Sequence, residues 1–262
     1  MQLAEGQVVY SDAIGMDVPP DVAELLLNPM QTEGFGWPLW LIAGLLLAWF
    51  MITGVRRGTL SFAALIFLSS ASLFWQEFFS NWGAYLVYSP KFELMAWDAP
   101  FASPNKPWFM IASYGVYYLT IFPLILWSAE KLRGAWPALS SLLAIIVVGL
   151  PLFYLFNFLF ETPATTNGWW AYMKSPGPHF GNYPLIYPIL PYSVCGLIMT
   201  YVLSLKSPEG VPAIENYRWV QNAAPGLGKE LRRLAAWVIN MNLMYWFFLC
   251  VPITLFRLSG IV

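Results

Sequence analysis

Six apolar segments constrain the fold of this chain more than any other feature. Each is close to the ~20 residues of helix that cross a hydrocarbon core of roughly 30 Å. Of the 262 residues, 58% are hydrophobic and 10% are charged, whereas soluble domains carry about a quarter charged residues. Period-two alternation is absent, so we expect helices and not a β-barrel. The segments are residues 37–55, 60–75 running on to 79, 108–128, 138–160, 184–205 and 234–256.

The basic residues predict how these helices are oriented. One set of loops holds nine of the thirteen Lys and Arg residues, so we expect these loops to be cytoplasmic and both termini to lie outside. The first 36 residues contain no Lys or Arg, which suits an outside segment and differs from a basic signal peptide. The nine are Arg56, Arg57, Lys131, Arg133, Lys206, Arg218, Lys229, Arg232 and Arg233.

The sequence predicts an all-α membrane protein, a polytopic bundle of six transmembrane helices with structured outer loops. Residues 76–107 and 161–183 are rich in Pro, Gly, Asn and aromatics, which favour ordered turns. Pro19, Pro20 and Asp21 ahead of residues 22–27 predict a short capped helix on the outer surface. We therefore divide the chain into an extramembrane segment, 1–36, and a six-helix transmembrane domain, 37–262.

Composition gives little reason to expect nucleic acid, metal or a disulfide framework. The net charge is −1 and the pI is near 5.8, unlike a nucleic-acid-binding domain. Cys195 and Cys250 both fall inside predicted spans, and the single histidine cannot build a metal site alone.

Two glutamates are the candidate functional residues, because an ionisable group at membrane depth is expensive and usually functional. Glu77 and Asn81 are four residues apart at the outer end of the second segment, and Asn157 and Glu161 repeat this spacing in the fourth. If each helix continues, each pair shares one face. Two carboxyls in one aromatic pocket can divide into a proton donor and a proton acceptor.

A structural explanation of the same glutamates stays open. Acids at helix ends can snorkel to the interface or pair with a loop lysine, here Lys91 or Lys174.

Other polar residues are weaker candidates. Gln76 is a possible hydrogen-bond donor to a substrate oxygen, or it bonds a neighbouring helix. His179 is a possible general base or gate, or a plain surface residue. Tyr183, Tyr187 and Tyr192 are candidates for the wall of a cavity.

These motifs resemble the AveC-like family of small integral membrane proteins, which is named for the spirocyclase of avermectin biosynthesis and is found widely in bacteria. The resemblance runs from about Leu60 to the C-terminus. The stretch FWQE at 74–77 with Asn81 stands where the family shows Trp-Gln-Asp-Pro and a following Asn. FNFLFE at 156–161 resembles its span ending in Glu, and GNYPL at 181–185 resembles its Gly-x-Tyr/Phe-Pro-Leu stretch.

The chain departs from the family pattern at two places. Glu77-Phe78 replaces Asp-Pro, which moves the carboxyl outward by a methylene and removes a proline. Ile186-Tyr187-Pro188 follows where a Tyr and then an acid are expected. The resemblance therefore supports the fold better than the activity.

The resemblance implies acid-catalysed closure of a lipophilic dihydroxy-ketone or polyol to a spiroketal, sometimes with dehydration, in the bacterial inner (cytoplasmic) membrane. On this hypothesis Glu77 is the acid and Glu161 the stabilising base. Gln76, Asn81 and Asn157 position substrate oxygens, no cofactor is needed, and the substrate arrives from the bilayer.

A non-catalytic role is the main alternative. A charge-poor, aromatic-rich bundle could be an accessory subunit that packs against a larger membrane complex, with lipids and other subunits as its partners. A transporter is disfavoured, because no two spans show matching inverted breaks.

Overall fold

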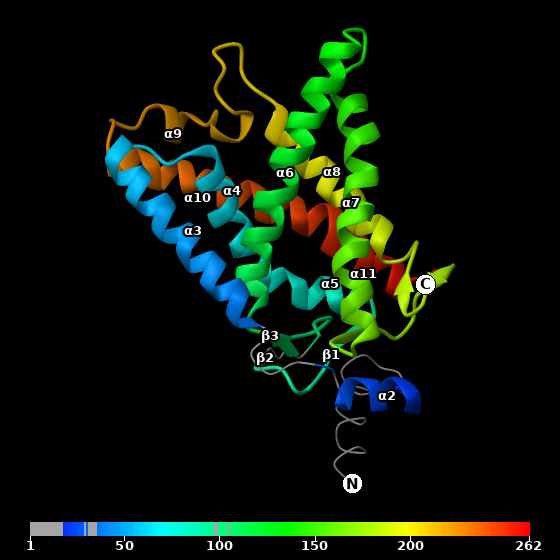
Figure 1. Ribbon diagram of the computed structural model, residues 1–262. Helices are drawn as coiled ribbons and strands as arrows, with labels where there is room; N and C mark the ends of the chain where they lie inside the picture. The colour runs from blue at the N-terminus through cyan, green and yellow to red at the C-terminus, as the bar shows by residue number, and fades with distance from the viewer. Residues whose placement is uncertain (1–17, 29, 31–35, 97–98, 104) are drawn as a thin grey trace.

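The computed structural model describes residues 18–28, 30, 36–96, 99–103 and 105–262 (Figure 1). Long helices form most of the molecule, and the strands β1 to β3 gather with the short helix α2 at one end (Figure 1). Residues 1–17, 29 and 31–35 of the predicted extramembrane segment lie outside the described residues.

Five stretches of helix in the described chain are long and apolar enough to cross a membrane, which defines a multi-pass membrane protein. Serine caps mark two of the starts: Ser61 Oγ accepts from the amide of Ala64, and Ser140 Oγ from the amide of Leu143. The five are α3 (Gly36–Arg57), α4–η1–α5 (Phe62–Gly83), α6 (Met110–Ala135), α7 (Ser141–Thr166) and α10–η3–α11 (Leu227–Leu258).

The sixth predicted span is shorter than expected. Residues 184–205 contain the helix α8 (Ile189–Ser204), which has 16 residues and a length of ~24 Å at 1.5 Å per residue. Pro184 belongs to the strand β6 (Tyr183–Pro184), and Pro188 precedes the first helical residue. These prolines delay the start of the helix. The number of spans and the side on which the termini lie therefore stay predictions.

Helix boundaries also differ from the sequence interpretation where the polar residues lie. Helix α7 continues through Pro163 to Thr166, so Glu161 lies within a helix and not at its end. The last long helix begins at Leu227, seven residues before the predicted start at Leu234.

Two of the long helices change their winding halfway. The second consists of α4 (Phe62–Ala71), a 3₁₀ segment η1 (Ser72–Gln76) and α5 (Glu77–Gly83). The last consists of α10 (Leu227–Tyr245), a π segment η3 (Trp246–Cys250) and α11 (Val251–Leu258).

The irregular segments of these two helices bond to each other. Asn242 Nδ2 donates to Ser72 Oγ at 2.7 Å, and Cys250 Sγ donates to the Gln76 carbonyl at 3.4 Å. Winding irregularities of this kind often occur at functional sites, and here the 3₁₀ segment ends directly before Glu77, the first residue of α5.

Three short antiparallel strand pairs order the two long loops. The strand β1 (Leu86–Tyr88) pairs with β4 (Trp170–Tyr172), and so joins the two loops that follow the glutamates. The other pairs are β2 (Leu94–Ala96) with β3 (Asn105–Pro107), and β5 (His179–Phe180) with β6.

Helix α2 (Pro20–Leu27) confirms the short helix predicted near residue 20, although no side chain caps it. Its buried Leu26 packs with Val87 of β1 and Ala171 of β4. Successive side chains of a strand point to opposite faces, so α2 covers one face of the β1–β4 pair and leaves the other face to the helices.

A buried ionic network holds the helices at the opposite end. Glu215, 5% exposed, lies in η2 (Ala213–Glu215) and accepts from Arg233 and from the indole of Trp237, both in α10. Arg233 also bonds Glu230 and the hydroxyl of Thr59. The short helix α9 (Arg218–Gln221) lies in the same connection.

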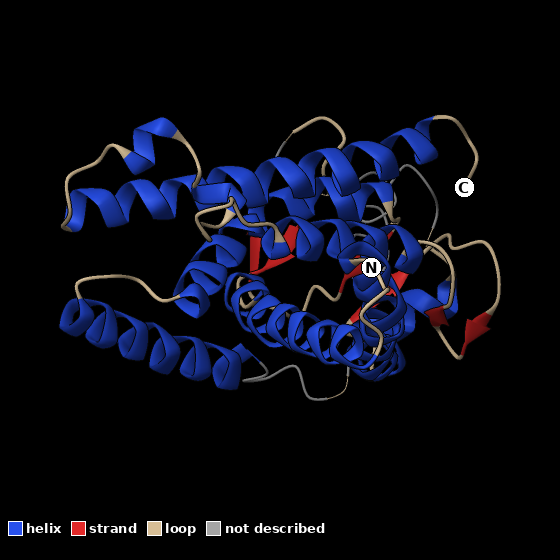
Figure 2. Cartoon of the chain, turned by 90° about the horizontal axis from the view of Figure 1, so that it is seen from above, coloured by secondary structure: helices blue, strands red, loops and turns tan. Residues whose placement is uncertain are grey.

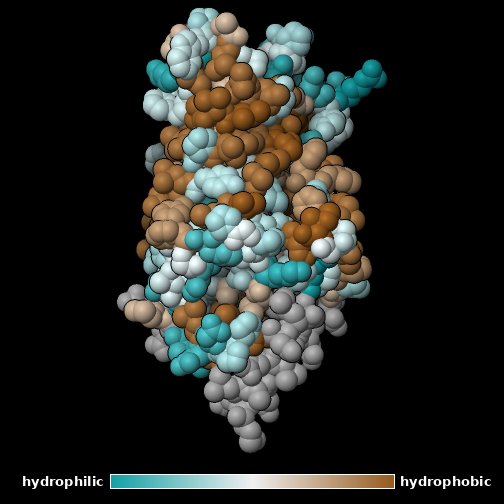
Figure 3. All heavy atoms as spheres, turned by 90° about the vertical axis from the view of Figure 1, so that its right-hand side faces the viewer, coloured by the Kyte–Doolittle hydropathy of each residue, from teal (hydrophilic) through white to brown (hydrophobic). Residues whose placement is uncertain are grey.

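The surface suits a bilayer. A broad hydrophobic band lies between two more hydrophilic ends on the face shown in Figure 3. Helix α3 lies at the edge of the bundle (Figure 2), and only 11% of the residues in its most apolar stretch are buried. The basic C-terminal ends of α3 and α6 lie away from the strands (Figure 1).

The predicted orientation can be measured with single cysteines, because the native Cys195 and Cys250 are both buried. In intact cells an impermeant maleimide should label Lys91→Cys and Lys174→Cys, both at exposed positions. Glu209→Cys, which is also exposed, should react only after lysis. Reversed labelling would overturn the orientation.

Candidate functional site

A cavity of about 840 Å³ lies among α5, α6, α7, α8 and α10, beside the β1–β4 pair. Its volume is within the roughly 300–1,000 Å³ range of small-molecule sites. Glu77, Asn81, Asn157 and Glu161 all line it, so the structure brings both predicted acid–amide pairs to one site. Much of the remaining wall is aromatic, and it includes Tyr88, Tyr114, Tyr117, Phe153, Phe156, Trp170, Tyr172, Tyr192 and Tyr245.

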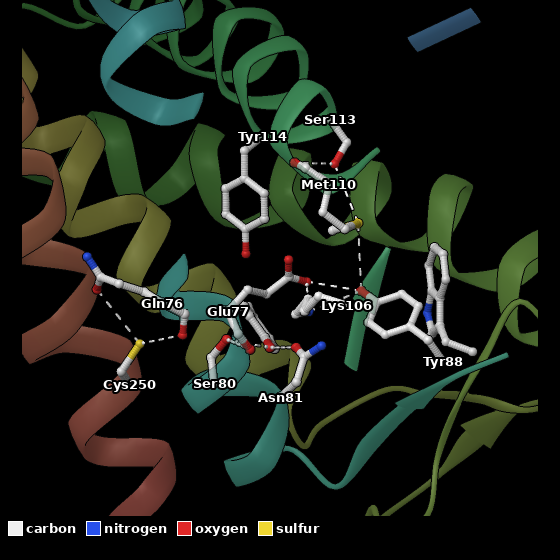
Figure 4. A network of polar contacts seen from close by, with 12 residues as sticks. Gln76, Glu77, Ser80, Asn81, Tyr88, Lys106, Met110, Ser113, Tyr114 and Cys250 are labelled. Carbon is white, nitrogen blue, oxygen red and sulfur yellow. Dashed lines mark hydrogen bonds and ion pairs between the residues drawn. The ribbon is translucent and has the colours of Figure 1, made fainter. Parts of the chain in front are cut away.

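Glu77 is buried and held by a cation. Its carboxyl Oε1 is 2.7 Å from Nζ of Lys106 and accepts a hydrogen bond from the Tyr88 hydroxyl at 3.0 Å. The Lys106 side chain is fully buried, and the Glu77 side chain is 7% exposed. Figure 4 shows the carboxyl between Lys106 and Tyr88 on one side and Tyr114 on the other.

Lys106 is the ion-pair partner of Glu77 that the sequence analysis did not identify. It lies in β3, opposite Met95 of β2, and its ammonium lies 4.6 Å from the centre of the Tyr88 ring. Burial lowers the pKa of Lys106 to about 8, although attraction to Glu77 opposes that change. A glutamate does pair with a loop lysine, as the structural explanation predicted. The lysine is Lys106, and not Lys91 or Lys174. A single lysine in an irregular loop gives no periodic signal that would mark it as buried.

The other oxygen of Glu77 has no hydrogen-bond partner among the described residues. Glu77 Oε2 and Asn81 Nδ2 are both buried side-chain atoms without a partner. Asn81 Oδ1 accepts from the Tyr192 hydroxyl at 3.4 Å, so its amide group remains a donor. Unpaired buried polar atoms are costly, and here one acceptor and one donor belong to residues that line the same cavity.

Glu161 is held by neutral donors. Its Oε2 accepts from the Trp170 indole at 2.7 Å and from the Tyr172 hydroxyl at 2.9 Å. Within the described part of the chain no Lys, Arg or His lies within ion-pair distance of Glu161. Burial raises the pKa of Tyr172 well above its ordinary value, so Tyr172 remains an O–H donor to the carboxyl.

The β1–β4 pair links the two carboxyl environments. Tyr88 bonds Glu77, whereas Trp170 and Tyr172 bond Glu161. Tyr88 and Trp170 are direct partners in the register, with ring centroids 5.5 Å apart. A single strand pair therefore supplies side-chain partners to both acids.

Two further hydrogen-bonded pairs of side chains line the cavity from the long helices. The hydroxyls of Tyr114 in α6 and Tyr245 in α10 are 2.6 Å apart. One hydroxyl donates its proton to the oxygen of the other, so the second hydroxyl keeps an O–H that can donate to another group. Asn157 Oδ1 accepts from the Tyr117 hydroxyl at 3.0 Å.

Four predicted substrate-positioning residues do not line the cavity. Gln76 turns toward α10, where its amide donates to Asn242 Oδ1 at 2.6 Å, as the helix-bonding alternative predicted. His179 is exposed in β5 and bonds Ser175 at 2.6 Å. Tyr183 packs against the ring of Phe158.

The fourth of these residues, Tyr187, has a structural hydrogen bond. Its hydroxyl donates to the Gly83 carbonyl at 2.7 Å, where α5 ends. An aromatic-rich sequence does not show which rings face a cavity and which pack, so the sequence alone could not separate Tyr183 and Tyr187 from the tyrosines that line the cavity.

The described residues contain no group of three or more His, Cys, Asp or Glu placed to hold a metal ion. The polar groups at the site are carboxyls, amides, hydroxyls and one ammonium. Such groups can transfer protons and stabilise positive charge.

The fold and the cavity define a multi-pass membrane protein with a buried acidic site. A family model described as "Spirocyclase AveC-like" matches residues 55–261, and the chain belongs to this family. The matched region contains both glutamates and Lys106, and membership supports a cyclase-related role in general. No curated protein and no solved structure matches the chain.

The buried ion pair predicts a specific stability pattern. Lys106→Met leaves the Glu77 charge buried without a cation and should cost about 3–5 kcal/mol, measured as a lower midpoint of thermal unfolding in detergent. Adding Glu77→Gln should recover most of the loss, because both charges are then gone. The control Lys91→Met removes an exposed lysine. Wild-type stability in Lys106→Met would contradict the pairing.

Proposed function

We propose that this chain is a membrane-embedded, acid-catalysed cyclase of the bacterial cytoplasmic membrane. It closes a lipophilic dihydroxy-ketone to a spiroketal-type ring with loss of one water, with or without a further dehydration. The observation that carries the proposal is the pair of carboxyls in one aromatic cavity, one beside a buried cation and one beside neutral donors.

Glu77 serves as the carboxylate in this proposal. Lys106 neutralises its charge at 2.7 Å, which supports the ionised form in a buried site. Its unpaired Oε2 is the atom that accepts a proton and stabilises positive charge. Because the stabilising charge is already in place, little reorganisation is needed during the reaction.

Glu161 serves as the proton donor. Without a cation to compensate it, a charge on this buried carboxyl is costly, and the second charge at Glu77 adds repulsion. Two carboxyls whose environments differ in this way can divide acid and base roles. These roles are the reverse of those that the resemblance suggested, and Lys106 is the reason.

The proposed steps balance in atoms and charge. One substrate hydroxyl adds to the ketone and gives a hemiketal. Glu161 protonates the hemiketal hydroxyl, the C–O bond breaks, and water leaves an oxocarbenium ion. The second hydroxyl attacks that carbon while its proton passes to Glu77 Oε2. Transfer of a proton from Glu77 back to Glu161 restores the site, so the net change is loss of one water.

The remaining polar groups position oxygens. Asn81 Nδ2 is an unpaired donor, and the Tyr114–Tyr245 pair keeps one O–H donor. Both suit the ring and carbonyl oxygens of a bound hydroxy-ketone, which accept hydrogen bonds. The aromatic wall favours a folded conformer in which the second hydroxyl approaches the cation.

The accessory-subunit alternative has no specific support. The exposed apolar side chains of α3, such as Trp49 at 64% exposure, suit lipid as well as protein.

The proposed roles predict different behaviour of two isosteric variants. The substrate in the assay is a long-chain dihydroxy-ketone in detergent micelles. Glu161→Gln and Glu77→Gln should each lower its turnover by at least ~10²-fold, the usual contribution of general acid–base catalysis. Lower pH should partly rescue Glu161→Gln, since solvent protons replace the missing donor, but should not rescue Glu77→Gln. Spiroketal formation is followed by mass spectrometry and chiral chromatography.

The control for this assay is Glu209→Gln, which changes an exposed acid outside the cavity and should leave turnover unchanged. Wild-type turnover in both cavity variants would end the cyclase proposal and leave only the fold.

A further inference from the structure

The cavity is closed at its strand end. Leu86 and Tyr88 of β1 and Trp170 and Tyr172 of β4 line it, whereas the alternate residues Val87 and Ala171 pack under α2. This alternation is what a two-residue strand period requires. The β1–β4 pair is therefore a wall with the cavity on one face and α2 on the other.

Hydrogen bonds fix this wall to the segment around α2. Ser89 Oγ donates to the Leu26 carbonyl at 2.6 Å, and the Trp169 indole donates to the Met30 carbonyl at 2.6 Å. Ser89 N also donates to the Trp169 carbonyl at 2.9 Å. A route through the strand end would have to break these contacts.

The cavity instead reaches the side of the helical bundle. Several of its lining residues are also exposed on the outer surface: Thr120 of α6, and Leu159 and Phe160 of α7, which are 58% and 59% exposed. Pro38 of α3 is likewise exposed and lines the cavity. Because α3, α6 and α7 are membrane-spanning candidates, this opening faces lipid and not water.

The opening is lined largely by aromatic side chains and lies beside the N-terminal half of α6. Tyr117, Phe156 and Phe160 form a mutual aromatic cluster there, with centroids 6.3–6.4 Å apart. Thr120 follows Met110, the first residue of α6, by ten positions, or ~15 Å of helix. That depth is about half of a ~30 Å hydrocarbon core.

We infer that the opening between α6 and α7 is a lateral portal for a single-chain amphiphile from the leaflet that contains the N-terminal end of α6. The oxygen-bearing part of the ligand reaches Glu77 and Asn81, while its apolar chain remains among Tyr117, Phe156 and Phe160. This inference rests on the proposed function, since it names the substrate class of the same site.

Photolabelling tests the portal without measuring turnover. Protein in nanodiscs is irradiated with a long-chain diol that carries a diazirine beside its hydroxyls, and labelled peptides are identified by mass spectrometry. Wild-type protein should be labelled on the α5 and α8 peptides that contain Glu77 and Tyr192. Leu159→Trp, which fills the opening, should lose this labelling.

The matched control is Val147→Trp, on the same helix at 50% exposure and away from the cavity; it should be labelled like wild type. If Leu159→Trp fails to fold, Thr120→Trp tests the same opening from α6. Unchanged labelling of α5 and α8 in a folded portal variant would overturn the inference. Wild-type labelling by the diol, together with no turnover of the long-chain dihydroxy-ketone by the same protein, would instead leave the portal standing and remove the proposed function.

Discussion

The ion pair between Glu77 and Lys106 is the constraint on which the site depends. Removing two charges from water costs several kcal/mol per ion, so each charge needs the other at the observed 2.7 Å. Lys106 lies in β3 and Glu77 at the start of α5. The pair thus fixes the strand region to the helix that carries the acid, and it leaves one carboxylate oxygen unpaired in the cavity.

Helix irregularity and strand pairing complete this arrangement. The 3₁₀ segment η1, which ends directly before α5, and the π segment η3 bond each other, while the β1–β4 register brings Tyr88 and Trp170 together. The same strand pair separates the cavity from α2. One small element therefore supplies partners to both acids and leaves the side of the bundle as the open route.

Much of the fold can be predicted from the sequence, because a bilayer permits only backbone structures that satisfy their own hydrogen bonds. Long apolar segments must be helical in a bilayer. Helix α3 is close to its predicted bounds, whereas α6 and α7 begin within three residues of theirs and run six or seven residues further. The pairs Glu77 with Asn81 and Asn157 with Glu161 reach one cavity because a four-residue spacing keeps each pair on one helical face. Helix α8 was predicted at 184–205 but is shorter, because prolines delay its start.

The tertiary contacts of the site could not be predicted in the same way. Lys106 is brought to Glu77 by the β2–β3 hairpin, and no local pattern around residue 106 encodes that contact. Gln76 lies one residue before Glu77 but points to Asn242, since the 3₁₀ turn directs it elsewhere. The contact between Lys106 and Glu77 is the reason that the roles proposed for the two acids differ from those that the resemblance implies.

We expect the two buried carboxyls to differ in protonation, because in the described chain Glu77 has a cation at ion-pair distance and Glu161 has none. Infrared difference spectroscopy with ¹³C-labelled glutamate measures this directly at neutral pH. The account predicts a carbonyl stretch of a protonated carboxylic acid in wild-type protein that disappears in Glu161→Gln. A band that persists in Glu161→Gln and disappears in Glu77→Gln would contradict it.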